Sequence, residues 1–267
     1  MIVYFIRHGQ TADNLRGIIQ GHIDTPLNNH GRKEARLLAD RLKDVKFDEA
    51  WSSSLSRARE TAEIVLQHHP GLPLRTDPGL MERCLGSLQG SRWTKGHPLP
   101  DDVEATDVFR KRITDWFLSF LAAQQTDTAS TLASDSPGGT AERNILVASH
   151  GAYLTAFLSI LIHLPFCFAY PDDLDIKQSC HNTSIMKVQL FPRSEISNRD
   201  GDGAMWKEVL SRMEEIEAKE GTKKGQKVQG RSEWVGMVQS WADVKHLEQK
   251  GEEVDVGVAD DLGEAAR

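Results

Sequence analysis

The stretch Ile2-Val3-Tyr4-Phe5-Ile6-Arg7-His8-Gly9 decides the fold of this chain. Its five consecutive apolar residues predict a strand covered on both faces, as in a parallel sheet between helices. Polar residues follow directly, and the carboxyl ends of buried strands are where α/β proteins bind ligands. Ile145–Ala148 repeats the pattern, since this apolar run leads into Ser149-His150-Gly151. The sequence therefore predicts two strands whose ends face one pocket.

Helical and strand patterns alternate along the rest of this region. Asn28 is the expected N-cap of a helix whose apolar face recurs at three- and four-residue spacing, and Ser56 is the expected cap of a second helix. The remaining expected elements are helices over 104–124 and 152–164, and strands over 50–53, 74–76 and 184–190. This alternation predicts an α/β fold of three layers, α/β/α, with a mostly parallel central sheet and helices on both faces.

The chain has 267 residues and a formal net charge of -7. The residues after 193 account for -6 of this net charge. We therefore expect a catalytic domain over 1–193 and an acidic, partly helical C-terminal extension over 194–267. In the extension, two amphipathic stripes, beginning at Trp206 and at Trp234, predict two helices that dock on the core. The polar, Gly-containing segment 126–143 predicts a mobile surface loop.

Composition also bears on location and partners. The three cysteines are few and widely spaced, which favours a reducing, cytoplasmic setting over a disulfide framework. The uncharged segment 152–170 approaches the length of a membrane span, but Pro165 interrupts it, so we expect a buried helix and a loop. The acidic balance argues against nucleic acid as a partner.

Several cationic groups gather near the two predicted strand ends. Arg7 stands beside His8, and Arg57 lies at the start of the second helix. A guanidinium group binds phosphate oxygens with two parallel hydrogen bonds and keeps its charge. The helix that follows Gly151 would add its N-terminus, which favours an anion. Two arginines, two histidines and a helix N-terminus together predict a site for a phosphoryl group.

Five ordered motifs resemble the signatures of the histidine phosphatase superfamily, also called phosphoglycerate-mutase-like. Arg7-His8-Gly9-Gln10-Thr11 with Asn14 is similar to its R-H-G-[EQ]-[TS]-x-x-N motif. The other four motifs are found in residues 24–31, 52–62, 80–90 and 147–151. The resemblance covers residues 2–151 and the late strand over 182–190, and it implies the fold expected above.

The resemblance also implies roles for individual residues. His8 would be the nucleophile that forms a phosphohistidine, and Glu82 would be the general acid and then the base. The residues implied to hold the phosphoryl group or the substrate are Arg7, Thr11, Asn14, Gln20, Arg57, His150 and Gly151. No cofactor and no metal is implied, and the expected partner is a small phosphorylated metabolite.

Both a phosphatase and a cofactor-dependent phosphoglycerate mutase use this kind of site. The mutases carry a long insert with paired arginines after the Gln-Gly motif, whereas Arg92 and Lys95 are the only basic residues between Gln89 and Glu104. This difference favours hydrolysis. Ile18–Gly21 further resembles fructose-2,6-bisphosphatases of the TIGAR type, although Gln89 replaces their Glu.

Two other classes of function would require different residues. A metallohydrolase would use histidines such as His8, His150 and His181 as ligands, but none of these three begins an H-x-E or H-E-x-x-H spacing, and the arginines would repel a cation. A catalytically inactive binding protein would be expected to lack His8, Glu82 or an arginine, and all are present. The sequence therefore favours a phosphoric monoester hydrolase.

Overall fold

The computed structural model describes residues 1–92, 99–131, 142–163, 166–194, 203–224 and 233–248. A six-stranded sheet in the order β3-β2-β4-β1-β5-β6 forms its centre. The strands are β1 (Ile2–Arg7), β2 (Phe47–Ser53), β3 (Leu74–Asp77), β4 (Asn144–Ser149), β5 (Ile185–Pro192) and β6 (Trp234–Asp243). The helices are α1 (Ala12–Arg16), α2 (Asn29–Leu42), α3 (Ser56–Val65), α4 (Thr106–Thr131), α5 (Gly151–Ile162), α6 (Gly203–Lys224) and α7 (Lys245–Glu248), with short 3-10 turns η1 (Leu66–His68), η2 (Pro78–Leu80) and η3 (Gly86–Leu88).

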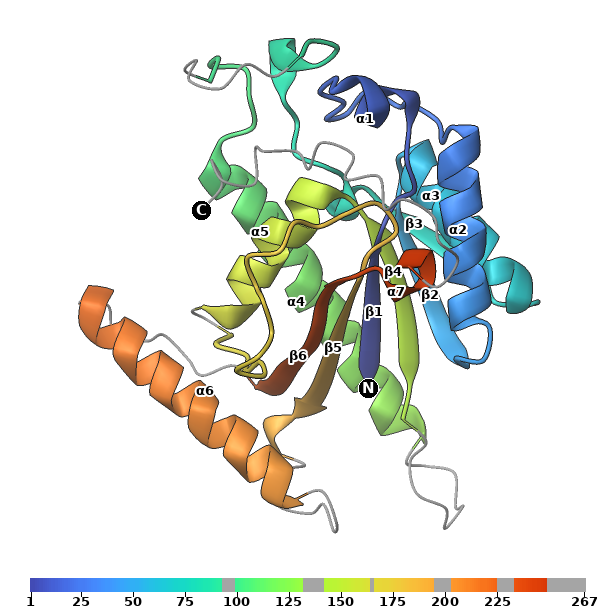
Figure 1. Ribbon diagram of the computed structural model, residues 1–267. Helices are drawn as coiled ribbons and strands as arrows, with labels where there is room; N and C mark the ends of the chain where they lie inside the picture. Colours follow the sequence, from blue (N-terminus) through green and yellow to red (C-terminus); the bar gives the residue numbers. More distant parts are fainter. Residues whose placement is uncertain (93–98, 132–141, 164–165, 195–202, 225–232, 249–267) are drawn as a thin grey trace.

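The central strands β1 and β4 are parallel neighbours and are buried on both faces. On one face Val3 and Phe5 pack with α4 and α5, and on the other Ile6 packs with α2 and α3 (Figure 1). Strands β1 to β4 pair in parallel, whereas β5 and β6 are antiparallel to their neighbours. The expected three-layer α/β fold with a mostly parallel sheet is therefore confirmed.

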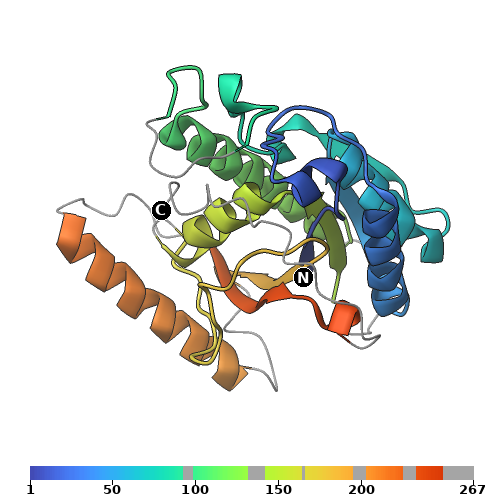
Figure 2. The same ribbon diagram turned by 45° about the horizontal axis from the view of Figure 1, so that its top comes forward.

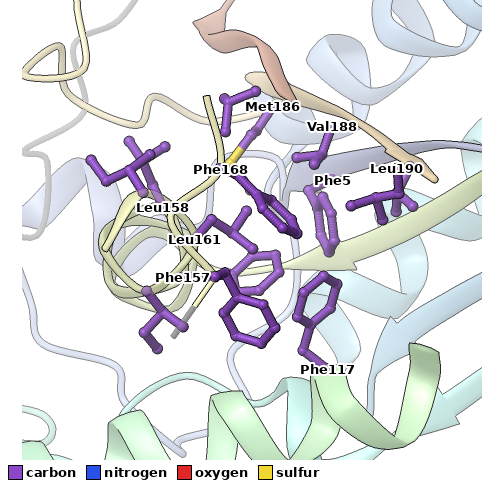
Figure 3. Close-up of a cluster of buried hydrophobic side chains, with 14 of the residues drawn as sticks. Phe5, Phe117, Phe157, Leu158, Leu161, Phe168, Met186, Val188 and Leu190 are labelled. Atoms are coloured by element: carbon purple, nitrogen blue, oxygen red, sulfur yellow. The ribbon is translucent and has the colours of Figure 1, made fainter. Parts of the chain in front are cut away.

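Aromatic rings fill the core on the α4 and α5 side, and Figure 3 shows this cluster. Phe157 of α5 makes edge contacts with Phe5 and Phe117 at centroid distances of 4.8 and 4.9 Å. Such pairs add about 0.5–1.5 kcal/mol each beyond the burial of their apolar area. The uncharged segment 152–170 thus begins as a helix of this core, and none of the helices in the described residues has the length and apolarity needed to cross a membrane.

Several predicted boundaries differ from the structure. Asn28 caps α2 as expected, since its side chain accepts the Gly31 N–H. Ser56 is not a cap but the first residue of α3, and its N–H donates to Asp24 at 2.6 Å. Residues 126–131 continue α4 rather than forming a loop, residues 132–141 lie outside the described part, and Arg143 pairs with Glu49.

The two stripes of the C-terminal region have different structures. The first is a helix, as predicted: in α6, Trp206 is buried and its ring contacts Phe191 at 4.2 Å. The prediction of a second helix is wrong, because residues 234–243 form β6 at the edge of the sheet (Figure 2). Two register shifts against β5 break the two-residue alternation, so the apolar spacing mimics a helix. Part of the expected extension thus completes the central sheet.

Candidate active site

The ends of β1 and β4 bring two buried histidines together. Arg7 and Ser149 are register partners in the parallel pair, so the residues that follow them, His8 and His150, emerge side by side. Their ring centroids are 5.2 Å apart, and both side chains are almost wholly inaccessible to solvent. The prediction that the two strand ends face one place is confirmed.

His8 is held in one tautomer by the backbone of the next residue, Gly9. Its Nδ1 lies 2.7 Å from the Gly9 carbonyl oxygen, which can only accept a hydrogen bond. Nδ1 therefore carries the hydrogen, and Nε2 keeps the lone pair. Burial, and then the charges of Arg57 and Arg7, hold the pKa of His8 well below its usual range. The imidazole is neutral at physiological pH and has a nucleophilic nitrogen at Nε2.

The backbone after His8 is fixed by very close packing. A Cβ atom at Gly9 would lie 2.5 Å from the Gly31 carbonyl oxygen, and one at Gly31 would lie 2.1 Å from the carbonyl oxygen of Gln10. The Gly9 N–H donates to Thr61 Oγ1 at 3.0 Å. The glycines of two separate sequence motifs therefore meet here, because only residues without a side chain allow the α2 N-terminus to approach the loop that follows β1.

Two guanidinium groups are buried beside the histidines. Arg7 Nη1 donates to the Cys180 carbonyl oxygen at 2.5 Å, and a Cβ at Gly151 would lie 3.0 Å from Arg7 Cζ. Arg57 donates to the carbonyl oxygens of Gly21 and Ile23 at 2.8 and 2.9 Å. Backbone carbonyls hold both side chains in place, and their positive charge makes this part of the interior suited to an anion.

His150 presents one ring nitrogen to Ser53 Oγ, at 2.8 Å. Its other nitrogen, Nδ1, is buried and has no hydrogen-bond partner among the described residues. Burial, followed by the charge of Arg57, the neighbouring His8 and the charge of Arg7, lowers the pKa of His150 well below its usual range. A buried nitrogen in a cationic setting is available to a ligand, such as a phosphoryl oxygen.

The carboxyl group of Glu82 sits at the N-terminus of α5. Its two oxygens accept three backbone N–H groups, from Arg83 at 2.9 Å, Tyr153 at 3.0 Å and Ala152 at 3.1 Å. The segment that carries Glu82 is tied to α4, because Arg112 donates to the Met81 and Glu82 carbonyl oxygens. These bonds place the carboxyl group next to Gly151 and in a fixed orientation.

The predicted residues Thr11, Asn14 and Gln20 lie together in one buried network. Thr11 caps α1, its N–H and hydroxyl contact Asn14 Oδ1 at 3.0 Å, and its hydroxyl is also 3.0 Å from Gln20 Oε1. Because Arg57 binds the carbonyl of Gly21, the network is joined to the arginine site. The structure thus brings all nine predicted residues to the same end of the sheet.

Sequence reasoning gave no role to several residues of this site. Ser53 and Thr61, which contact His150 and Gly9, fall inside a recognised motif but had no assigned contact. His22 had no signal at all, and its Nε2 binds the Glu82 carbonyl oxygen at 2.8 Å. Gln89 accepts the N–H groups of His22 and Leu85 through its amide oxygen, an acceptor role that the expected Glu could also fill.

The sequence model of the histidine phosphatase superfamily (branch 1) matches residues 3–202. The chain belongs to this family, and the site described above lies within the matched residues. The match ends before β6 and α7, which lie outside it.

Three relatives are similar over different lengths. A probable phosphatase of Schizosaccharomyces pombe is 46% identical over 34% of this chain and 43% of its own length. A broad-specificity phosphatase of Saccharomyces cerevisiae is 33% identical over 51% of this chain and 65% of its own length. The chain thus matches less than two thirds of either yeast protein. A probable fructose-2,6-bisphosphatase, TIGAR A, of Danio rerio is 28% identical over 68% of this chain and 85% of that protein.

Among solved structures, the phosphoglycerate mutase of Bacillus anthracis superposes with a TM-score of 0.62. The superposition covers 94% of this chain and 97% of that protein at 21% identity, so it shows a shared fold.

The buried histidines predict that the protein loses stability in mild acid. Below about pH 6.5 the unfolded chain takes up protons on these imidazoles, whereas native His8 and His150 stay neutral. The free energy of unfolding, measured with urea, should therefore fall by about 1 kcal/mol per pH unit for each buried histidine.

The slope between pH 7.5 and 5.5 should become shallower in His150→Gln. It should stay unchanged in His68→Gln, whose side chain is exposed. An unchanged slope in His150→Gln would contradict the assignment.

Proposed function

We propose that the protein is a phosphomonoester hydrolase that acts through a phosphohistidine on small phosphorylated metabolites. The observation that carries this proposal is the state of His8: neutral, fixed by its Nδ1 hydrogen bond, and buried within reach of the charges of two arginines. A nucleophile of this kind needs no further base, and the guanidinium groups offset charge on the phosphoryl oxygens. Family membership and the phosphatase names of the relatives support the same reaction.

In the proposed first step, the Nε2 lone pair of His8 attacks phosphorus and the bond to the leaving oxygen breaks. Arg7, Arg57, His150, Asn14 and the Gly151 N–H hold the phosphoryl oxygens, and Thr11 and Gln20 shape the network that orients Asn14. Glu82 gives its proton to the leaving oxygen, which departs as an alcohol. In the second step Glu82 takes a proton from water, water attacks the phosphohistidine, and inorganic phosphate is released.

For the substrate we propose sugar phosphates and related metabolites, with fructose 2,6-bisphosphate as one candidate. Two of the similar proteins are named as a broad-specificity phosphatase and a fructose-2,6-bisphosphatase. The alternative is a cofactor-dependent phosphoglycerate mutase, and a protein named as a phosphoglycerate mutase shares the fold. The absence of paired arginines between Gln89 and Glu104 favours hydrolysis.

Incubation with a ³²P-labelled phosphomonoester, followed by rapid quenching, should leave label on the protein that is labile in acid and stable in base. The label should be absent from His8→Ala, since Nε2 is the proposed attacking atom. His68→Ala is the matched control and should retain it. Acid-labile label on His8→Ala would exclude His8 as the nucleophile.

Replacement of Glu82 by Gln should affect poor leaving groups more than good ones. Turnover of an alkyl phosphate should fall about 100-fold, because its leaving oxygen needs a proton, whereas p-nitrophenyl phosphate should lose less than about tenfold. The control is Glu104→Gln, which weakens the ion pair of Glu104 with Arg112, the residue that also binds the Glu82 carbonyl oxygen. It should lower both rates equally. Equal losses of turnover on the two substrates in Glu82→Gln would contradict the role of Glu82 as the general acid.

With 3-phosphoglycerate and 2,3-bisphosphoglycerate, the protein should release phosphate and form little 2-phosphoglycerate. Hydrolysis dominates if water reaches the phosphohistidine before a second phosphoglycerate does. The two products can be followed together by ³¹P NMR. Isomerisation faster than phosphate release would instead support the mutase alternative.

A further inference from the structure

The C-terminal strand returns the chain to the catalytic end of the sheet. Because β5 is antiparallel to both β1 and β6, β6 runs in the same direction as β1. Asp243 at the end of β6 is the register partner of Ile185, which pairs with Ile6 just before Arg7. Helix α7 therefore begins beside the strand end that carries His8, and it lies against α2 in Figure 1.

Contacts with α2 fix α7 in this place. Arg41 binds both carboxylate oxygens of Asp243, at 3.0 and 2.6 Å. Val244 and Leu247 bury their side chains against Leu37 of α2. A bidentate ion pair and a small apolar cluster thus hold the segment that carries His246.

His246 points one nitrogen at each of two neighbours. Arg41 can only donate, so Nδ1 of His246 is the acceptor at 3.4 Å. Nε2 therefore carries the hydrogen in the neutral ring and donates it to Thr183 Oγ1 at 2.9 Å. Burial, assisted by the charge of Arg41 and opposed by Asp243, lowers the pKa of His246 to about 4, so the ring is neutral at physiological pH.

Thr183 has a backbone conformation that a β-branched residue rarely adopts. Its φ of 55° lies in the left-handed region, and such strain persists only where the surroundings hold it. The hydrogen bond from His246 supplies this restraint on the side chain. In this conformation the Thr183 N–H and Asn182 Nδ2 both point at the His8 carbonyl oxygen, at 3.3 and 2.9 Å.

The same loop also reaches Arg7, through the carbonyl of Cys180. Earlier in this loop, the carbonyl oxygen of Gln178 accepts the indole N–H of Trp241 in β6 at 2.8 Å. The loop that contacts both Arg7 and His8 is therefore held at two points by residues that lie beyond the family match.

We propose that His246 is a positioning residue for catalysis, which acts through Thr183 to hold the His8 backbone in its reactive place. The segment 234–248 is then part of the catalytic unit rather than an appended tail. The inference rests on the proposed role of His8 as nucleophile and extends it to a residue outside the family motifs.

The test compares His246→Leu, which removes the donor, with His246→Gln, whose side-chain amide can replace the Nε2–H. With p-nitrophenyl phosphate, kcat and the rate of phosphohistidine formation should fall about tenfold in His246→Leu while KM changes less than twofold, since misplacement of a nucleophile slows chemistry. His246→Gln should recover most of the loss. Met213→Ala, which removes a buried side chain of α6, should lower the melting temperature but leave kcat unchanged.

A double-mutant cycle gives the decisive measurement. Thr183→Val keeps the β-branched shape and removes the hydroxyl, so it should lower kcat by a similar factor, and the double variant with His246→Leu should be no slower than either single variant. The proposal would be overturned if the kcat loss of the double variant equalled the product of the two single losses. A wild-type kcat in folded His246→Leu would also overturn it.

A second readout does not depend on turnover. In ¹⁵N-labelled protein the His8 imidazole signals, assigned with His8→Ala, should shift in His246→Leu and return in His246→Gln. Unchanged His8 signals in His246→Leu would overturn the positioning role. If wild-type protein formed no phosphohistidine while the signals shifted, the proposed function would fail and the structural coupling would stand.

Discussion

Two guanidinium groups buried beside two imidazoles impose the constraint on which the rest of this structure depends. A charge inside a protein costs several kcal/mol unless polar atoms surround it. Arg57 therefore needs the carbonyls of Gly21 and Ile23, and Arg7 needs that of Cys180. These requirements fix two loops that are far apart in the sequence beside the strand ends that carry the histidines.

The same charges set the chemistry of the histidines. Because burial and the arginines lower their pKa, His8 and His150 stay neutral near pH 6.5, where about half of most solvent-exposed histidines carry a proton. A neutral His8 has a lone pair for phosphorus, and the positive charge that binds the phosphoryl group comes from arginines that cannot lose it. The loss of stability in mild acid is the thermodynamic consequence of this arrangement.

How much could be predicted depends on how local each signal is. The apolar runs of β1 and β4 and the Asn28 cap are local patterns, and the structure confirms them. The prediction that Ser56 caps α3 is wrong, because Ser56 is the first helical residue and its N–H donates to Asp24, which is 32 residues away. The helix predicted at Trp234 is wrong because its apolar residues recur at three- and four-residue spacing, which β6 accommodates through register shifts that exist only when it pairs with β5.

By itself, the sequence determined the chemical content of the site: which strands are buried, and that each ends in a histidine followed by a glycine. These features follow from hydrophobic periodicity and from the freedom of glycine, which are properties of short segments. Only the tertiary structure decided the tautomer of His8, the carbonyl partners of the arginines and the return of His246 to the site. Each of these depends on the direction of a strand or on a hydrogen bond between segments distant in sequence, and no local pattern encodes such a contact.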